Sequence, residues 1–258
     1  MPPIRAKKHL GQHFLHDAEI ARRIAESLTP GLVSHTLEVG PGTGILTQFL
    51  LENRQINLVA IEIDEESVEY LHSHFPQLNV IKGDFLKSDI ESFFDEKFSI
   101  IGNFPYNISS QIFFKILEHK NQIPQVVCML QKEVAERITS LPGKKAYGIL
   151  SVFMQAFYSA DYLFTVHEHV FDPPPKVKSA VVRFTRNEVQ TLACDEKAFR
   201  TVVKTAFNQR RKTLRNSLKP LVGKDNSLLT ESIFDKRPEQ LNVEEFVVLT
   251  NKISTVSG

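Results

Sequence analysis

The chain has 258 residues, of which 42% are hydrophobic and 24% charged, a composition typical of a soluble globular protein with one large and one small domain. No apolar run approaches the roughly 18 residues of a membrane helix, and residues 1–15 lack the apolar centre of a signal peptide. Cys128 and Cys194 lie far apart, without the paired spacing of zinc or redox sites. We therefore expect a cytoplasmic protein with reduced thiols and no bound metal.

The first half of the chain alternates between helical and extended patterns. Asp17 is a candidate N-cap for the first helix, and Pro30-Gly31 closes that helix. The predicted helices are 17–28, 45–53, 65–75, 88–94 and 109–119, and the predicted strands are 36–39, 58–63, 78–82, 98–102 and 125–130. This alternation predicts an α/β fold with a doubly wound, Rossmann-like and mainly parallel sheet.

The alternation fades in the second half of the chain. Helices are predicted at 132–139 and 148–159, and strands at 163–168 and 179–186 that could pair as an antiparallel addition. Beyond residue 195 only helical patterns remain, at 196–207, 212–218, 226–234 and 243–253. We therefore expect a main domain at 1–190, which includes a basic N-terminal arm at 1–16, and a small all-helical domain at 191–258.

Positive charge is concentrated in the helical domain. The formal net charge is only +1, yet Lys197–Lys224 holds nine basic residues and no acidic one. Such a segment predicts a nucleic-acid partner, because lysine and arginine displace counterions from phosphates; the alternative is a solvated helix face. The candidate RNA-binding residues are Lys204, Arg210, Arg211, Lys212 and Arg215.

Three predicted strands end in residues suited to a nucleoside-containing cofactor. The loop Gly40-Pro41-Gly42-Thr43-Gly44 resembles both a dinucleotide fingerprint and the first loop of S-adenosylmethionine-dependent methyltransferases, although a plain strand-to-helix turn would also fit. Glu62 ends the second strand, where a carboxylate accepts ribose hydroxyls. Asp84 follows the third strand, where it would accept from an adenine amino group.

The fourth predicted strand runs into Asn103-Phe104-Pro105-Tyr106-Asn107. Pro105 fixes its own φ and restrains Phe104, so the loop is stiff. It presents an amide, outward backbone carbonyls and an aromatic ring within four residues. These groups suit a planar base that carries an exocyclic amine, although a strand-ending turn is the simpler alternative.

Several stretches together resemble one family, the small-subunit ribosomal RNA adenine N6-dimethyltransferases. They are Leu10–Leu15, Glu38–Gly44, Asn103–Ser109, Leu130–Val134, Lys145–Gly148, Phe171–Lys176, Ser179–Arg183 and Ala206–Leu218. The resemblance implies transfer of methyl groups from S-adenosyl-L-methionine to two adjacent adenosines near the 3′ end of 16S rRNA, coupled to ribosome biogenesis. His13 and Phe104 depart from the family, which more often has Asn and Leu there.

The resemblance also implies residue roles. His13 and Leu15 would cover the cofactor, Gly40 would pack on its methionine part, and Asn103 would bridge cofactor and target. The target adenine would be flipped out and stacked by Tyr106 and Phe171. The implied partner is the small ribosomal subunit, with a monomer as the default state.

Two other functions remain open from the sequence. One is adenine methylation of large-subunit rRNA, of the macrolide-resistance type, against which the segments Lys145–Gly148 and Ala206–Leu218 argue. The other is an RNA-binding assembly factor without catalysis, against which the intact Asn103–Tyr106 loop argues.

Overall fold

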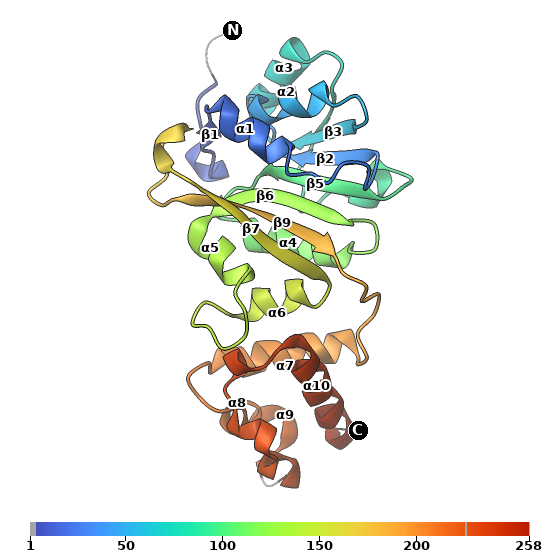
Figure 1. Cartoon of the computed structure of the whole chain (residues 1–258), viewed down its shortest axis with the longest axis vertical. Coiled ribbons are helices and arrows are strands. Elements are labelled where there is room, and N and C mark those ends of the chain that lie inside the picture. Colours follow the sequence, from blue (N-terminus) through green and yellow to red (C-terminus); the bar gives the residue numbers. More distant parts are fainter. Residues whose placement is uncertain (1–3, 225, 258) are drawn as a thin grey trace. The chain divides into compact units, whose positions relative to one another are not determined.

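The chain forms two compact units in a computed structural model that describes residues 4–224 and 226–257 (Figure 1). The first unit consists of Met1–Ala135 and Ser159–Arg186, and the second of Glu136–Tyr158 and Asn187–Gly258. The sequence assigns segment 136–158 to the main domain, but this segment groups with the helical unit. The chain passes into the helical unit for the second time after Arg186, near the boundary predicted at residue 190.

A seven-stranded sheet is the centre of the first unit, with the order β4-β3-β2-β5-β6-β9-β7. Its strands are β2 (His35–Val39), β3 (Asn57–Glu62), β4 (Asn79–Lys82), β5 (Phe98–Asn103), β6 (Gln125–Gln131), β7 (Tyr158–Val166) and β9 (Ser179–Arg186). Neighbouring strands from β4 to β6 are parallel, and β9 is antiparallel to β6. A separate two-stranded sheet pairs β1 (Phe14–Leu15) with β8 (Phe171–Asp172).

Helices cover both faces of the large sheet. They are α1 (Ala18–Ala25), α2 (Ile45–Glu52), α3 (Glu65–His74) and α4 (Ser109–Glu118), with 3-10 helices η1 (Lys8–Leu10), η2 (Ile90–Phe93) and η3 (Glu168–Val170). One core joins α1, α2 and α3 to Val181 of β9, whereas Phe113 of α4 packs edge-on against Phe184, at 5.3 Å between ring centroids. Because side chains alternate along a strand, Val181 and Phe184 face opposite sides of the sheet.

The order in which successive strands are added to the sheet reverses between the parallel neighbours β2 and β5. β2 lies between β3 and β5, so the connections from β2 and β5 leave toward opposite sides, as Figure 1 lets the reader follow. In open α/β sheets ligands bind at the carboxyl ends of the strands where the order reverses. Gly102 allows β5 to approach β2 closely there, because a Cβ atom on it would lie 2.4 Å from the Val39 carbonyl oxygen.

The second unit is helical. It contains α6 (Ile149–Gln155), α7 (Glu196–Asn208), α8 (Leu214–Ser217), α9 (Lys219–Val222), α10 (Val243–Ser257) and 3-10 helices η4 (Ser227–Thr230), η5 (Ser232–Asp235) and η6 (Pro238–Gln240), while α5 (Lys132–Ile138) spans the crossing between units. Asp195 caps α7 by accepting from the Ala198 amide. Phe207 of α7 stacks on Phe246 of α10 at 6.0 Å between centroids, so aromatic packing joins these helices.

The predicted doubly wound α/β fold is confirmed, and three elements differ from the prediction. The helix expected at 148–159 ends at Gln155, and β7 begins at Tyr158. The helix expected at 226–234 is two 3-10 helices, and that at 88–94 is the 3-10 helix η2. Within the described residues no helix is long and apolar enough to cross a membrane, and no cluster of three or more His, Cys, Asp or Glu side chains is placed to hold a metal.

Candidate active site

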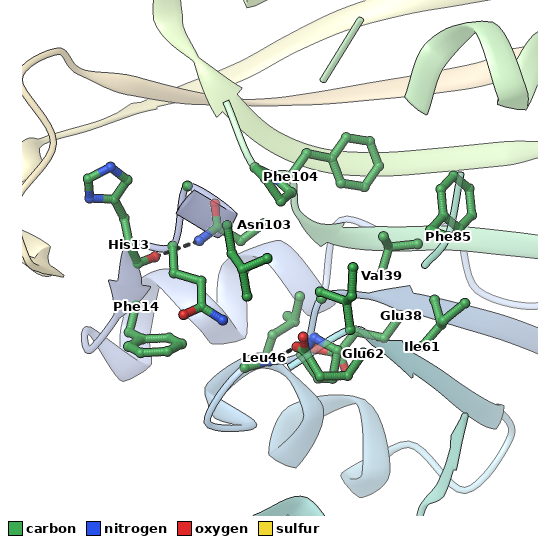
Figure 2. A pocket seen from close by; sticks show the side chains of 18 of the residues that line it. His13, Phe14, Glu38, Val39, Leu46, Ile61, Glu62, Phe85, Asn103 and Phe104 are labelled. Atoms are coloured by element: carbon green, nitrogen blue, oxygen red, sulfur yellow. Dashed lines mark hydrogen bonds between the residues drawn. The ribbon is translucent and has the colours of Figure 1, made fainter. Parts of the chain in front are cut away.

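One pocket lies at the carboxyl ends of the parallel strands, within the first unit (Figure 2). The loops after β2, β3, β4 and β5 form its walls, and residues Leu10–Leu15 of the N-terminal arm complete it. Nine of the site residues expected from the sequence line it, namely His13, Leu15, Gly40, Glu62, Asp84, Asn103, Phe104, Pro105 and Tyr106. Residues that sequence patterning places at separate strand ends therefore share one cavity.

Glu62 holds the glycine loop in place. Its Oε2 accepts the Gly42 amide at 3.0 Å, and its Oε1 accepts the Asp64 amide at 2.9 Å. Burial raises the pKa of Glu62, and these backbone hydrogen bonds oppose that shift. Because each carboxylate oxygen can accept more than one hydrogen bond, Glu62 keeps lone pairs for a ligand in the pocket.

Glu38 is a second buried acid beside the pocket, and sequence reasoning gave it no role of its own. Its side chain is 1% exposed, and its Oε2 accepts the Thr47 hydroxyl at 2.7 Å. Burial raises the pKa of Glu38 to about 8, and the nearby Glu62 adds to the shift. Glu38 is therefore largely protonated at neutral pH and adds little negative charge to the pocket.

Asp84 stands in a loop that is fixed from two sides. Its Oδ1 accepts the Leu86 amide at 2.9 Å, which orders the turn locally. Lys115 of α4 donates from Nζ to the carbonyl of Leu86 at 3.1 Å and to that of Ser88 at 2.6 Å. The helix that follows the Asn103 loop thus also supports the loop that carries Asp84.

Asn103 is oriented by the N-terminal arm. Its Nδ2 donates to the His13 carbonyl at 3.0 Å, drawn as a dashed line in Figure 2. A carbonyl can only accept, so this bond fixes which amide atom is Oδ1. Among the described residues no donor reaches Oδ1, which is thus available to a ligand.

Phe104 offers a second acceptor beside Asn103. Its ring is 1% exposed and packs edge-on against Phe113, while its amide donates to the Met129 carbonyl at 2.9 Å. In the described part of the chain its own carbonyl accepts no hydrogen bond. The buried ring therefore anchors a backbone carbonyl at the pocket.

Tyr106 is held at both ends of its side chain. Its hydroxyl hydrogen-bonds the Ser179 hydroxyl of β9, and its ring stacks on His13 with 5.5 Å between centroids and 28° between planes. Burial raises the pKa of Tyr106. The Tyr106 phenol therefore stays neutral, and its ring has a defined orientation at the pocket.

The N-terminal arm is tied to both sides of the pocket. On one side Lys7 pairs with Asp64, and Gln12 Nε2 donates to Asp64 Oδ2 at 3.3 Å. Burial would raise the pKa of Asp64, but the hydrogen bonds from Lys7 and Gln12 outweigh it and lower that pKa. On the other side His13 Nδ1 donates to the Pro173 carbonyl at 2.7 Å. Sequence reasoning missed the roles of Lys7, Gln12 and Asp64.

The remaining candidates are not among the residues that line this pocket. Phe171 is 2% exposed, belongs to the hydrophobic core and pairs with Leu15 across β1 and β8, so the structure does not bring it to the pocket wall. The RNA-binding candidates are in the second unit. Lys204, Arg211 and Lys212 are exposed, whereas Arg215 Nη2 pairs with Asp235 at 2.6 Å.

Comparison with known proteins gives matches along most of the chain. The model of the ribosomal RNA adenine dimethylase family matches residues 4–253. A protein of Parabacteroides distasonis named ribosomal RNA small subunit methyltransferase A is 60% identical over 249 residues, which cover 96% of this chain and 93% of that protein. A protein of the same name from Flavobacterium johnsoniae is 59% identical over 256 residues, covering 98% and 97%.

Two solved structures are similar to this chain over most of its length. A dimethyladenosine transferase from Plasmodium falciparum has a TM-score of 0.78 at 24% identity, covering 94% of this chain and 98% of its own. The 23S rRNA methyltransferase ErmE has a TM-score of 0.67 at 26% identity, covering 92% and 99%. The fold alone therefore does not identify the RNA substrate. The sequence identities of 59–60% to the small-subunit methyltransferases are the more specific finding.

Proposed function

Because the chain belongs to the ribosomal RNA adenine dimethylase family, we propose how its pocket divides between the methyl donor and the adenine that receives the methyl groups. The chain is an S-adenosylmethionine-dependent rRNA adenine dimethyltransferase. The RNA that it modifies is that of the small ribosomal subunit, 16S rRNA, with two adjacent adenosines near the 3′ end as targets. Relatives at 54–60% identity carry the small-subunit name, whereas the large-subunit enzyme ErmE is only 26% identical.

The glycine-loop side of the pocket suits S-adenosylmethionine. Gly40 and Gly42 have φ values of 69° and 57°, which let backbone approach a ligand without side chains in between. Glu62 would accept the ribose hydroxyls and Asp84 the adenine amino group, with His13 and Leu15 covering the cofactor from the arm. When bound, this cofactor supplies an electrophilic methyl group on a sulfonium.

The Asn103 side of the pocket suits the target adenine. Asn103 Oδ1 and the Phe104 carbonyl would accept the two hydrogens of the adenine N6 amine. Acceptance of both hydrogens draws the nitrogen toward tetrahedral geometry and stabilises the positive charge that develops on it. Tyr106 would stack on the flipped base, although His13 stacks on the Tyr106 ring in this structure. Phe171 would have to leave the hydrophobic core to stack on the base as well.

This mechanism needs no general base in the pocket. The methylated amine is a strong acid once it is cationic, so water or the RNA can take its proton. The nearest imidazole fits this view, because His13 Nδ1 already donates to the Pro173 carbonyl. Pro105 serves by stiffening the loop that aligns the acceptors. For a second transfer the monomethylated amine, which keeps one hydrogen, must rotate in the site, and the site must hold one more methyl group.

Lys204, Arg210, Arg211, Lys212 and Arg215 of the second unit form the proposed RNA-binding segment, in a helical domain that the sequence places at 191–258. We infer a monomer that acts in the cytoplasm, where ribosomal subunits are assembled. Basic residues dominate Lys197–Lys224, and charge complementarity to phosphate is the support for this part of the proposal.

The observation that carries the catalytic proposal is the pair of unused acceptors, Asn103 Oδ1 and the Phe104 carbonyl, at the wall of one pocket. The test is transfer of labelled methyl groups to small and large ribosomal subunits that lack the modification, followed by mapping of the modified nucleotides. We expect two adjacent dimethyladenosines near the 3′ end of 16S rRNA. Label in large-subunit RNA, or a soluble chain that binds cofactor and labels neither subunit, would refute the assignment.

A further inference from the structure

The segment between α5 and α6 is a braced loop within the second unit. Gln155 donates from Nε2 to the carbonyls of Ile138 and Ser140, at 2.8 and 2.9 Å. The Gly143 amide donates to the Glu239 carbonyl at 2.6 Å, and Tyr147 is fully buried against Phe207. The loop is therefore fixed at its start, its tip and its end.

Lys144 and Lys145 lie on the outer side of this loop. Both are exposed, and in the part of the chain that the structure describes neither side chain has an acidic partner. Side-chain ammonium groups on a flexible tip would lose much entropy on binding a polyanion. A braced backbone lowers that entropic cost, so this loop is suited to present its two charges to a phosphate chain.

Arg210 supplies the last brace. Its Nη2 donates to the Lys145 carbonyl and lies 3.5 Å from the Lys144 carbonyl oxygen. The guanidinium is therefore engaged with backbone of the same unit, and Arg210 is only partly exposed. It joins two segments that are 65 residues apart in sequence.

Two further cations follow Arg210 directly. Arg211 and Lys212 are exposed, and no described carboxylate pairs with either. The Lys212 amide donates to the Gln209 carbonyl at 2.8 Å, so they stand on a turn. Lys144, Lys145, Arg211 and Lys212 are thus brought together by one guanidinium, and we call these four residues the clamped basic surface.

We propose that the clamped basic surface binds RNA phosphates and that Arg210 is its positioning residue, not a phosphate ligand. This inference rests on the proposed function, since it takes rRNA as the partner. It adds Lys144 and Lys145, from outside the basic segment Lys197–Lys224, to the RNA contacts. It also removes Arg210 from them, because its Nη2 is directed at the Lys145 and Lys144 carbonyls.

The test measures binding of the full-length protein to unmodified small ribosomal subunits over a series of KCl concentrations at fixed Mg²⁺. Each lost phosphate contact lowers the slope of log affinity against log salt by roughly 0.7–0.9. The double variant Lys144→Ala/Lys145→Ala should therefore lower this slope by about two such increments, and Arg211→Ala should lower it by about one.

Arg210→Lys separates the two roles of Arg210. Lysine keeps the charge but lacks the guanidinium Nη2 that donates to the Lys145 carbonyl and lies 3.5 Å from the Lys144 carbonyl oxygen. We expect Arg210→Lys to weaken binding and reduce the slope as strongly as the double lysine variant, and to have no further effect in that background. The matched control is Arg211→Lys, which should bind almost as the original protein does, since a lysine also contacts phosphate.

The outcomes distinguish this inference from the proposed function. Original-like binding by Arg210→Lys, or a slope loss that simply adds to that of the lysine variant, would show a direct phosphate contact and overturn the inference alone. Unchanged salt dependence in Arg211→Ala and in the double lysine variant would overturn the basic segment as an RNA site altogether. Unchanged cofactor affinity and unfolding temperature establish that each variant is folded.

Discussion

Replacement of Asn103 by alanine tests the core of the proposed mechanism. Oδ1 is an unused acceptor at the pocket, and its removal resembles the loss of one donor from an oxyanion hole. Such a loss lowers kcat by about 10²–10³. Asn103→Ala also deletes the Nδ2 bond to the His13 carbonyl, a neutral hydrogen bond worth about 0.5–1.5 kcal/mol. That second effect is at most about a tenfold loss of cofactor affinity.

Two measurements separate these effects. The rate of single-turnover methyl transfer to unmodified small subunits measures the loss of the Oδ1 acceptor. The affinity for S-adenosylmethionine, from calorimetric titration, measures the loss of the bond to the N-terminal arm. Asn103→Asp keeps an oxygen and loses the donor, so it should retain more of the transfer rate than Asn103→Ala while binding cofactor no better. If Asn103→Ala transferred methyl groups within about twofold of the original rate, Asn103 would be a tether for the arm and the charge-stabilising role would be wrong.

Three further perturbations follow from contacts of the site. Ser179→Ala should lower kcat/KM by about fivefold, as should Tyr106→Phe, and the double variant should lose no more, because both delete one hydrogen bond. Asp64→Asn should speed cofactor dissociation severalfold in stopped-flow traces, because it weakens the pair that holds Lys7 of the arm. Glu66→Gln removes the exposed partner of Lys7 and should change the dissociation rate little. Equal effects of the two variants would show that the Lys7 pair with Asp64 does not hold the arm. Burial raises the pKa of Glu38 to about 8 from its ordinary value of 4.5, so between these pH values the folded state binds a proton that the unfolded state has lost. The stability that this group contributes below pH 4.5 is therefore lost as the pH rises toward 8. Denaturant unfolding of Glu38→Gln should therefore show a flatter decline of stability between these pH values than the original chain shows.

The sequence predicted the strand ends that build the pocket. Gly40, Glu62 and Asn103 each follow or end an apolar run, and in a parallel sheet such positions share one edge. Because these strands are buried on both faces, each is a nearly continuous run of apolar residues. Their positions can therefore be predicted without knowing which strands pair with one another. The fold and the strand-end residues of the pocket follow from that one regularity, whereas His13 and Leu15 were expected only from the family resemblance.

Polar contacts between distant segments were not predictable in the same way. Lys7 with Asp64 and Tyr106 with Ser179 are separated by 57 and 73 residues, and neither pair has a periodic signal. The end of α6 was missed for a related reason. Residues 148–159 are apolar enough for a helix throughout, and only pairing within the sheet decides that Tyr158 begins β7.

The N-terminal arm connects the two halves of the active site. Asp64, which holds Lys7 and Gln12, also donates its amide to Glu62 on the cofactor side. At the far end of the arm, the His13 carbonyl holds the Asn103 amide on the adenine side. A detached arm would therefore leave Glu62 with a less constrained neighbour and Asn103 free to rotate Oδ1 away from the target amine. Since the same few residues position the donor site and the acceptor site, cofactor binding and readiness of the adenine pocket are expected to rise and fall together.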